Sequence, residues 1–220
     1  MDRPIGGEAD GVPRRRRRPV PYPGQRALDL VVCAVAAVQA LLLVAVAALA
    51  VRLTSRGPVF FTQERVGMDG RPFVMVKLRT MVHRPQARTA VHDEKLVTPV
   101  GRVLRKFSLD ELPQLYNVLR GEMSIVGPRP TVAYQVEQYD DRQRRRLLVR
   151  PGLTGLAGVS GRNGLTWAER IVLDLEYVER QSLWFDLSIL LRTPRVLLFG
   201  VGVGEQRPDD PLARLAADDE

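Results

Sequence analysis

The sequence predicts a small α/β domain, mostly helical, that is carried on one N-terminal membrane-inserted helix. The first observation is the segment Leu30–Val51, which is apolar apart from Gln39. The second is a pair of short runs rich in β-branched and aromatic residues, Val59–Phe61 and Phe73–Val76, which flank an Asp-Gly turn. The third is a series of amphipathic helical patterns in the second half of the chain.

Composition limits the possible functions. The chain has 220 residues, enough for one domain, and an apolar content of 45% excludes a disordered protein. A single cysteine, Cys33, excludes an internal disulfide framework and a cysteine zinc site. The net charge of +8 predicts anionic partners such as phosphates, nucleic acid or a membrane surface.

The apolar segment predicts a membrane-inserted helix over residues 26–53. As a helix, Leu30–Val51 covers roughly 33 Å, about one hydrocarbon thickness. A signal peptide, a single span and a re-entrant helix are the three alternatives, and the segment exceeds the ~7–15 apolar residues of a signal peptide. Basic residues on both flanks, Arg14–Arg18 and Arg52, favour re-entry, which keeps both flanks on the cytoplasmic side. The segment has no Pro or Gly to turn the chain back, so the topology stays open.

The remaining chain divides into three parts. Residues 1–25 are rich in Pro, Gly and Arg and predict a disordered basic arm, and residues 201–220 predict an acidic disordered tail. Residues 54–200 predict a cytoplasmic domain at the membrane face. Within this domain, the polar residues 82–98 are expected to form a loop.

Two adjacent carboxylates lie at the start of a predicted helix. One apolar helical face is predicted by the spacing of Leu112, Leu115, Tyr116 and Leu119. Gly121 ends this helix. Ser108 begins a capping-box pattern, whereas Pro113, tolerated only in a first turn, favours Asp110 as the N-cap. In either register Asp110 and Glu111 lie at a helix N-terminus, where a phosphate would also be attracted. The two carboxylates could equally serve only as caps.

Four further segments are candidates for binding or packing. Gly127–Pro130 holds the backbone rigidly around Arg129, and an arginine-rich helix is predicted over Val132–Leu148. The stretch Arg150–Gly164 has a glycine at every third position, which predicts either a structural loop or a cradle for phosphate. Leu183–Phe199 is predicted as a helix, either in the core or at the membrane interface.

Seven motifs, in this order and spacing, resemble the bacterial sugar transferases. These are the monotopic phosphoglycosyl transferases that begin cell-surface glycan assembly on a polyprenyl phosphate. The resemblance runs from about Arg26 to Phe199. The matching residues are Gly57–Phe61 (GPVFF), Gln63–Gly67 (QERVG), Lys77–Met81 (KLRTM), Ser108–Gly121 (SLDELPQLYNVLRG), Met123–Pro130 (MSIVGPRP), Arg150–Gly155 (RPGLTG) and Gly161–Asn163 (GRN).

The resemblance implies a reaction and a set of site residues. Family members transfer a sugar-1-phosphate from a UDP-sugar to undecaprenyl phosphate, release UMP, and so begin exopolysaccharide, capsule, O-antigen or glycoprotein glycan assembly. Asp110 and Glu111 match the catalytic dyad, with Asp110 as the nucleophile of a covalent aspartyl phosphosugar intermediate and Mg²⁺ bound by both. The resemblance implies substrate binding by Lys77, Arg79, Arg105, Pro128, Arg129, Pro130, Arg150, Arg162 and Asn163.

The resemblance also implies a location and leaves alternatives. It places the protein at the inner membrane, with its catalytic domain on the cytoplasmic face, one re-entrant helix and interfacial helices. Leu41-Leu42 stands where the family has a helix-breaking Ser-Pro pair, which bears on the re-entrant geometry but not on the chemistry. The alternative function is a non-enzymatic membrane-anchored protein that binds anionic glycan or lipid intermediates. Nucleic acid is not an expected partner, and the sugar, the pathway and a homodimer are left open.

Overall fold

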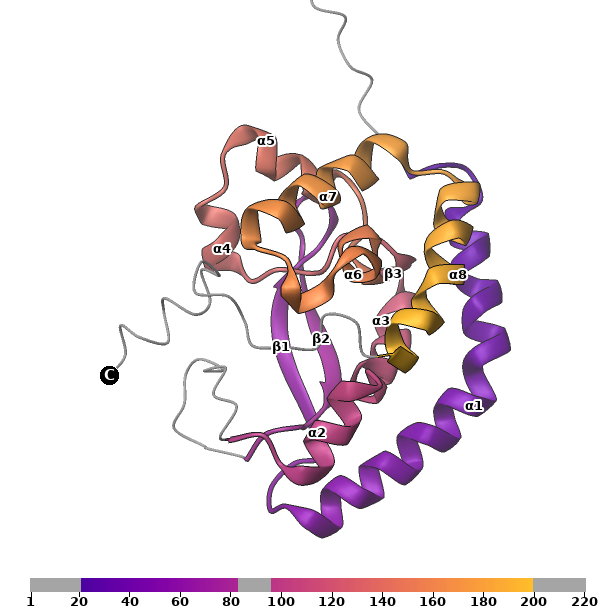
Figure 1. The fold of residues 1–220 in the computed structure, drawn as a ribbon, viewed down its shortest axis with the longest axis vertical. Helices are drawn as coiled ribbons and strands as arrows, with labels where there is room; N and C mark the ends of the chain where they lie inside the picture. Colours follow the sequence, from indigo (N-terminus) through magenta and orange to yellow (C-terminus); the bar gives the residue numbers. More distant parts are fainter. Residues whose placement is uncertain (1–20, 83–95, 200–220) are drawn as a thin grey trace, which may run out of the picture.

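A computed structural model describes residues 21–82 and 96–199, and these are mostly helical (Figure 1). The predicted basic arm, the acidic tail and most of the predicted 82–98 loop lie outside the described residues. The elements, in chain order, are α1 (Gln25–Thr54), β1 (Phe60–Val66), η1 (Met68–Gly70), β2 (Pro72–Leu78), α2 (Pro99–Lys106), η3 (Leu109–Gln114), α3 (Leu115–Arg120), β3 (Ser124–Val126), α4 (Ala133–Glu137), α5 (Asp141–Arg144), η4 (Arg145–Leu148), β4 (Gly152–Thr154), α6 (Leu156–Ser160), η5 (Arg162–Gly164), α7 (Trp167–Arg180) and α8 (Leu183–Phe199).

The predicted hairpin is confirmed and is longer than its apolar runs indicated. β1 and β2 pair antiparallel from Phe60 opposite Leu78 to Val66 opposite Pro72. The turn between them contains Asp69 and Gly70, both at positive φ, as an Asp-Gly turn requires. This hairpin carries Lys77 toward the site described below.

A second, two-stranded sheet forms where the sequence predicted a glycine-rich loop. β3 and β4 pair in parallel, with Ser124 opposite Gly152 and Val126 opposite Thr154. A Cβ atom on Gly152 would lie 2.1 Å from the backbone nitrogen of Gly127, so the two backbones are in direct contact. The loop prediction is therefore wrong for this part of the segment, because the glycines allow two strands to pack closely and α6 follows them.

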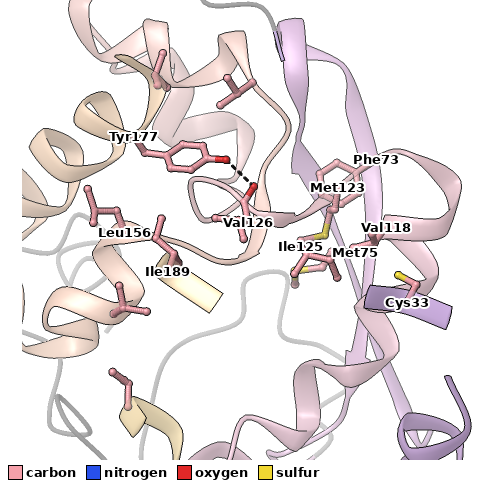
Figure 2. Packing of buried hydrophobic residues seen from close by; sticks show 14 residues of the cluster. Cys33, Phe73, Met75, Val118, Met123, Ile125, Val126, Leu156, Tyr177 and Ile189 are labelled. Atoms are coloured by element: carbon pink, nitrogen blue, oxygen red, sulfur yellow. Dashed lines mark hydrogen bonds between the residues drawn. The ribbon is translucent and has the colours of Figure 1, made fainter. Parts of the chain in front are cut away.

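The main core joins α1 to both sheets and to the last helices (Figure 2). Cys33 of α1 belongs to the same buried cluster as Met75 of β2 and Ile189 of α8. The Tyr177 hydroxyl donates a hydrogen bond to the Val126 carbonyl over 3.0 Å, which ties α7 to β3. The long apolar helix α1 is thus part of the domain core.

α1 is continuous past Leu41-Leu42 and curves along one side of the domain (Figure 1). Near its start, Asp29 Oδ1 accepts hydrogen bonds of 2.8 Å from Ser124 Oγ and from the Ile125 backbone. Near its end, Val51 packs with Leu78 and Leu104. Both ends therefore contact the same domain, and α1 is the only described helix long and apolar enough to cross a bilayer.

Large apolar residues lie exposed along α1 and on one side of α8. On α1 they are Leu30, Val31, Val35, Val38, Leu41, Leu42, Leu43, Val46, Leu49 and Leu53. On α8, Trp184 and Leu191 are exposed while Ile189 and Val196 are buried. The helix predicted over Leu183–Phe199 is confirmed with the same bounds. One face of it packs in the core and the other is exposed on the surface.

Two local predictions are wrong. The helix predicted over Val132–Leu148 divides into α4, α5 and η4, because Asp140 starts a new helix with a capping box to Gln143. The predicted apolar face also differs, since Tyr116 is 55% exposed. Asn117 is buried in its place, where its amide donates to the Val74 carbonyl of β2.

Candidate active site

A cavity of about 1210 Å³ contains the Asp110–Glu111 pair on its wall. Its polar part is formed by η3, β2 and the segment around Arg129. Its apolar part is lined by α1 and α8, through Val32, Ala36, Leu43, Leu190, Val196 and Leu197. The cavity is therefore lined by charged side chains, which suit a polar ligand, and by apolar side chains of α1 and α8.

The dyad lies on a 3₁₀ helix instead of at the N-cap of an α-helix. Pro113 has no N–H to donate, so residues 109–114 form the tighter η3 and the α-helix begins only at Leu115. Ser108 adopts a left-handed conformation with φ 54° and makes no capping hydrogen bond. Ser108 therefore occupies the N-cap position of η3 without forming the predicted capping box, and the alternative N-cap at Asp110 is wrong. Asp110 and Glu111 lie in the first turn of η3, so their predicted place at a helix N-terminus is confirmed. The Ser108 hydroxyl accepts a 2.7 Å hydrogen bond from Arg162 instead.

The two carboxyl groups differ in acidity although they are neighbours. Burial and the adjacent charge of Glu111 raise the pKa of Asp110, which is only 5% exposed, to about 6. Burial alone would raise the pKa of Glu111, but the charge and hydrogen bond of Arg129 outweigh it and lower that pKa. Arg129 Nη2 lies 2.7 Å from Glu111 Oε1. Glu111 is therefore held as a carboxylate, while a nearby cation would lower the raised pKa of Asp110.

The cavity wall is strongly cationic. Its lining holds nine basic residues and three acidic residues. Lys77, Arg105, Arg129 and Arg162 all act electrostatically on the dyad. Burial lowers the pKa of Lys77, whose ammonium lies 5.2 Å from the centre of the Phe61 ring. Such an excess of positive charge is suited to a ligand that brings several negative charges of its own.

Arg65 is a site residue that the sequence reasoning missed. It lines the cavity, and burial together with the charge of Arg129 lowers its pKa to about 10. Its Nη1 donates to the Pro130 carbonyl and its Nη2 to Gln63, but its buried Nε has no hydrogen-bond partner among the described residues. Arg162 Nη1 is also buried without a hydrogen-bond partner among the described residues. The only sequence signal for Arg65 was its place in the QERVG motif.

The predicted substrate-binding residues divide into two groups. Lys77, Arg105, Arg129, Pro130 and Arg162 line the cavity together with the dyad. Arg79, Pro128 and Arg150 do not line it, and the side chain of Asn163 is not described.

Three of the predicted residues that do not line the cavity make contacts within the fold. Arg79 Nη2 donates to the Ser55 carbonyl at the end of α1. Arg150 Nε donates to the Gly121 carbonyl at the end of α3. The Pro128 carbonyl accepts a bond from the Gly152 backbone. These contacts connect α1, α3 and the second sheet around the cavity, although Arg79 Nε and Nη1 have no hydrogen-bond partner among the described residues.

The dyad offers two carboxylates as possible ligands for Mg²⁺. Within the described residues, no group of three or more His, Cys, Asp or Glu side chains could hold a metal ion. Mg²⁺ is commonly held by one or two carboxylates, with substrate phosphates and water completing six oxygen ligands. Asp110 and Glu111 fit that pattern, and the raised pKa of Asp110 reflects a repulsion that a cation would relieve.

Comparison with known proteins identifies the family of this chain. The sequence model of the family described as "Bacterial sugar transferase" matches residues 21–200. The chain belongs to the bacterial sugar transferase family. The match covers every described element, from α1 to α8, and therefore includes both parts of the cavity wall.

Several relatives within this family are similar over most of the chain. The sugar transferase EpsL of Bacillus subtilis, named as uncharacterized, is 45% identical over 70% of this chain and 76% of its own length. A UDP-glucose:undecaprenyl-phosphate glucose-1-phosphate transferase of Caulobacter vibrioides is 46% identical over 79% of this chain and 69% of its own length. The exopolysaccharide production protein ExoY of Rhizobium meliloti is 38% identical over 82% of this chain and 88% of its own length.

Proposed function

We propose that this sugar transferase moves a sugar-1-phosphate from a UDP-sugar to undecaprenyl phosphate and releases UMP, as the first step of a cell-surface glycan. The observation that carries the proposal is the cavity itself. A buried carboxylate faces a cationic wall at one end, and the hydrocarbon surface of α1 and α8 lines the other. A diphosphate donor and a lipid phosphate acceptor need these two surfaces side by side. The name of the Caulobacter relative states the same pair of substrates.

Asp110 is the proposed nucleophile. One of its carboxylate oxygens attacks the phosphorus that bears the sugar, and the bond from that phosphorus to the bridging oxygen of UDP breaks. UMP leaves with the bridging oxygen, and an aspartyl phosphosugar remains. A phosphate oxygen of undecaprenyl phosphate then attacks the same phosphorus, which forms the lipid diphosphate sugar and frees the Asp110 carboxylate. Each half-reaction is balanced without any further reactant.

The cationic wall would serve both half-reactions. Attack by a carboxylate on a diphosphate brings anions together, so fixed positive groups must offset the repulsion. Lys77, Arg105 and Arg162 lie on that wall, and Arg129 keeps Glu111 ionised beside the nucleophile. Arg65 Nε and Arg162 Nη1 have no hydrogen-bond partner among the described residues but are buried, so a phosphate oxygen would reach them only after a side-chain movement.

Asp110 and Glu111 would hold Mg²⁺, with the remaining ligands coming from the diphosphate and from water. When bound there, the ion would neutralise diphosphate charge and favour the ionised form of Asp110. Arg129 binds one oxygen of Glu111, which limits the directions from which that carboxylate can reach a cation.

The proposed reaction is tested by measuring UMP release. Full-length protein in detergent is incubated with undecaprenyl phosphate, Mg²⁺ and a panel of UDP-sugars. We expect UMP release with at least one UDP-sugar. The release should stop when EDTA is added and return when Mg²⁺ is restored. The lipid-linked product is followed by mass spectrometry. UMP release that continues unchanged in EDTA would contradict the magnesium site, and binding of lipid intermediates without UMP release from any donor would favour the non-enzymatic alternative.

We further propose that α1 enters and leaves the same face of the membrane. A spanning helix separates its ends by the ~30 Å hydrocarbon core, whereas Asp29 and Val51 both contact one domain. Re-entry also keeps both basic flanks on the cytoplasmic side of the inner membrane. The curvature of α1 would replace the missing proline, and the outward apolar residues of α1 and α8 would face lipid.

This topology predicts the labelling of two introduced cysteines. Val20→Cys and Arg56→Cys are made separately in a Cys33→Ala background and treated with a membrane-impermeant maleimide. We expect neither cysteine to react in intact spheroplasts and both to react after lysis, since both flanks lie inside. Reaction of one of the two cysteines in intact spheroplasts would establish a span and contradict the proposal.

A further inference from the structure

Gln135 has a buried hydrogen-bond donor that the fold leaves unused at the wall of the cavity. It lies on α4, which follows directly after the Arg129–Thr131 segment of the active site. The residue is only 3% exposed, and its Nε2 finds no hydrogen-bond partner among the described residues. A buried donor without a partner destabilises the free protein, so a ligand that supplies an acceptor gains from it.

The surroundings of Gln135 differ from the phosphate-binding part of the site. Trp167, Arg146 and Asp174 line the same cavity. Arg146 is already engaged, since it pairs with Asp174 over 2.5 Å and its guanidinium lies 5.8 Å from the centre of the Trp167 ring. Arg170 lies close enough to act on Asp174 as well. Tyr139, one turn after Gln135, lies 6.1 Å from Trp167 between ring centres, so aromatic rings accompany this neutral amide. A neutral amide beside aromatic rings suits an uncharged polar ligand group, whereas the phosphates have the cations beside Asp110.

We infer that Gln135 is a donor-recognition residue, whose Nε2 gives a hydrogen bond to an uncharged oxygen of the UDP-sugar. A uracil carbonyl and a hexose hydroxyl both present that acceptor. The inference rests on the proposed function and extends it, because it assigns recognition of the uncharged part of the donor to α4. Gln135 lies outside the seven sequence motifs, and no periodicity distinguished it from the other polar residues of its helix.

The matched pair of variants is Gln135→Met and Gln138→Met. Methionine keeps the length of the glutamine side chain and removes the amide. Gln138 lies one turn later on the exposed side of the same segment and serves as the control. Both changes are made in full-length Asp110→Asn protein, so that bound donor is not consumed. Isothermal titration with UMP, UDP-glucose and UDP-galactose is carried out in detergent with Mg²⁺ present.

We expect Gln135→Met to weaken donor binding about three- to tenfold, the usual effect of one neutral hydrogen bond, while Gln138→Met leaves it unchanged. Equal weakening for UMP and both UDP-sugars assigns the contact to uridine, and weakening confined to UDP-sugars assigns it to the hexose. The thermal midpoint of Gln135→Met should be no lower than that of its parent, because no internal hydrogen bond is lost.

Unchanged affinity for all three ligands would overturn the inference while leaving the proposed function intact. A lowered thermal midpoint together with weaker binding would also overturn it, since the residue would then act through the fold. Failure of the Asp110→Asn parent to bind any UDP-sugar would instead count against the proposed function itself.

Discussion

Replacing Asp110 with asparagine is expected to reduce UMP release at least about a thousandfold, since the variant loses the nucleophile of a covalent mechanism. Asparagine has the same shape but no carboxylate oxygen to form the acyl phosphate. The cavity should otherwise persist, because the neutral amide removes a buried charge that burial and the charge of Glu111 already make less favourable. Initial rates of UMP release from the best donor, at saturating lipid acceptor, measure the effect.

The control for this substitution is Asp141→Asn, at an exposed carboxylate in the first turn of α5. It should keep the rate of the unchanged protein. A second readout uses donor labelled in the sugar, without lipid acceptor. The unchanged protein should retain label on the chain after denaturation, and Asp110→Asn should retain none. If Asp110→Asn keeps a tenth or more of the rate, Asp110 is not the nucleophile.

Replacing Gly152 with alanine is expected to produce the largest loss of stability among single methyl additions in the second sheet. The added Cβ would lie 2.1 Å from the Gly127 nitrogen and 2.5 Å from the Thr154 carbonyl oxygen. Gly127 directly follows β3 and Thr154 ends β4, and these two backbone atoms are hydrogen-bonded to each other, so the added methyl group would force the two segments apart. We expect a loss of about 3 kcal/mol or more, measured as a lower midpoint of thermal unfolding in detergent.

The matched control is Gly158→Ala in α6. The nearest atom to a Cβ there is Thr154 Oγ1 at 4.0 Å, an ordinary contact. Alanine is also the better helix former, by about 0.5–1 kcal/mol, so this variant should be neutral or slightly more stable. If Gly152→Ala unfolds at the same temperature as Gly158→Ala, the close packing of the two strands does not limit stability, and the phosphate-cradle interpretation of the segment regains support.

The features that the sequence predicts correctly are local or strongly patterned. The Asp69-Gly70 turn and its two strands follow from residues that are neighbours in the chain. α1 and α8 follow from long apolar runs. The position of the dyad beside Lys77, Arg105, Arg129 and Arg162 was implied by the family motifs, whose residues come together in the cavity.

The features that the sequence does not predict depend on contacts between distant segments. The use of Arg79 to hold the end of α1, in place of a role in the cavity, is decided by a contact with Ser55. The burial of Asn117 depends on an unpaired carbonyl of β2. Arg65 and Gln135 each have a buried N–H donor without a hydrogen-bond partner among the described residues. No motif or periodicity in the sequence predicts which donors stay without a partner.

The participation of α1 in the domain core has a consequence for how the protein matures. Cys33 packs in the main hydrophobic cluster, and Asp29 completes the hydrogen bonds of β3. Removal of the helix by proteolysis, or its failure to insert, would expose that cluster to water and leave buried backbone groups unpaired. We therefore expect insertion and folding to be coupled. An uninserted chain would present the exposed apolar surface that chaperones and proteases recognise.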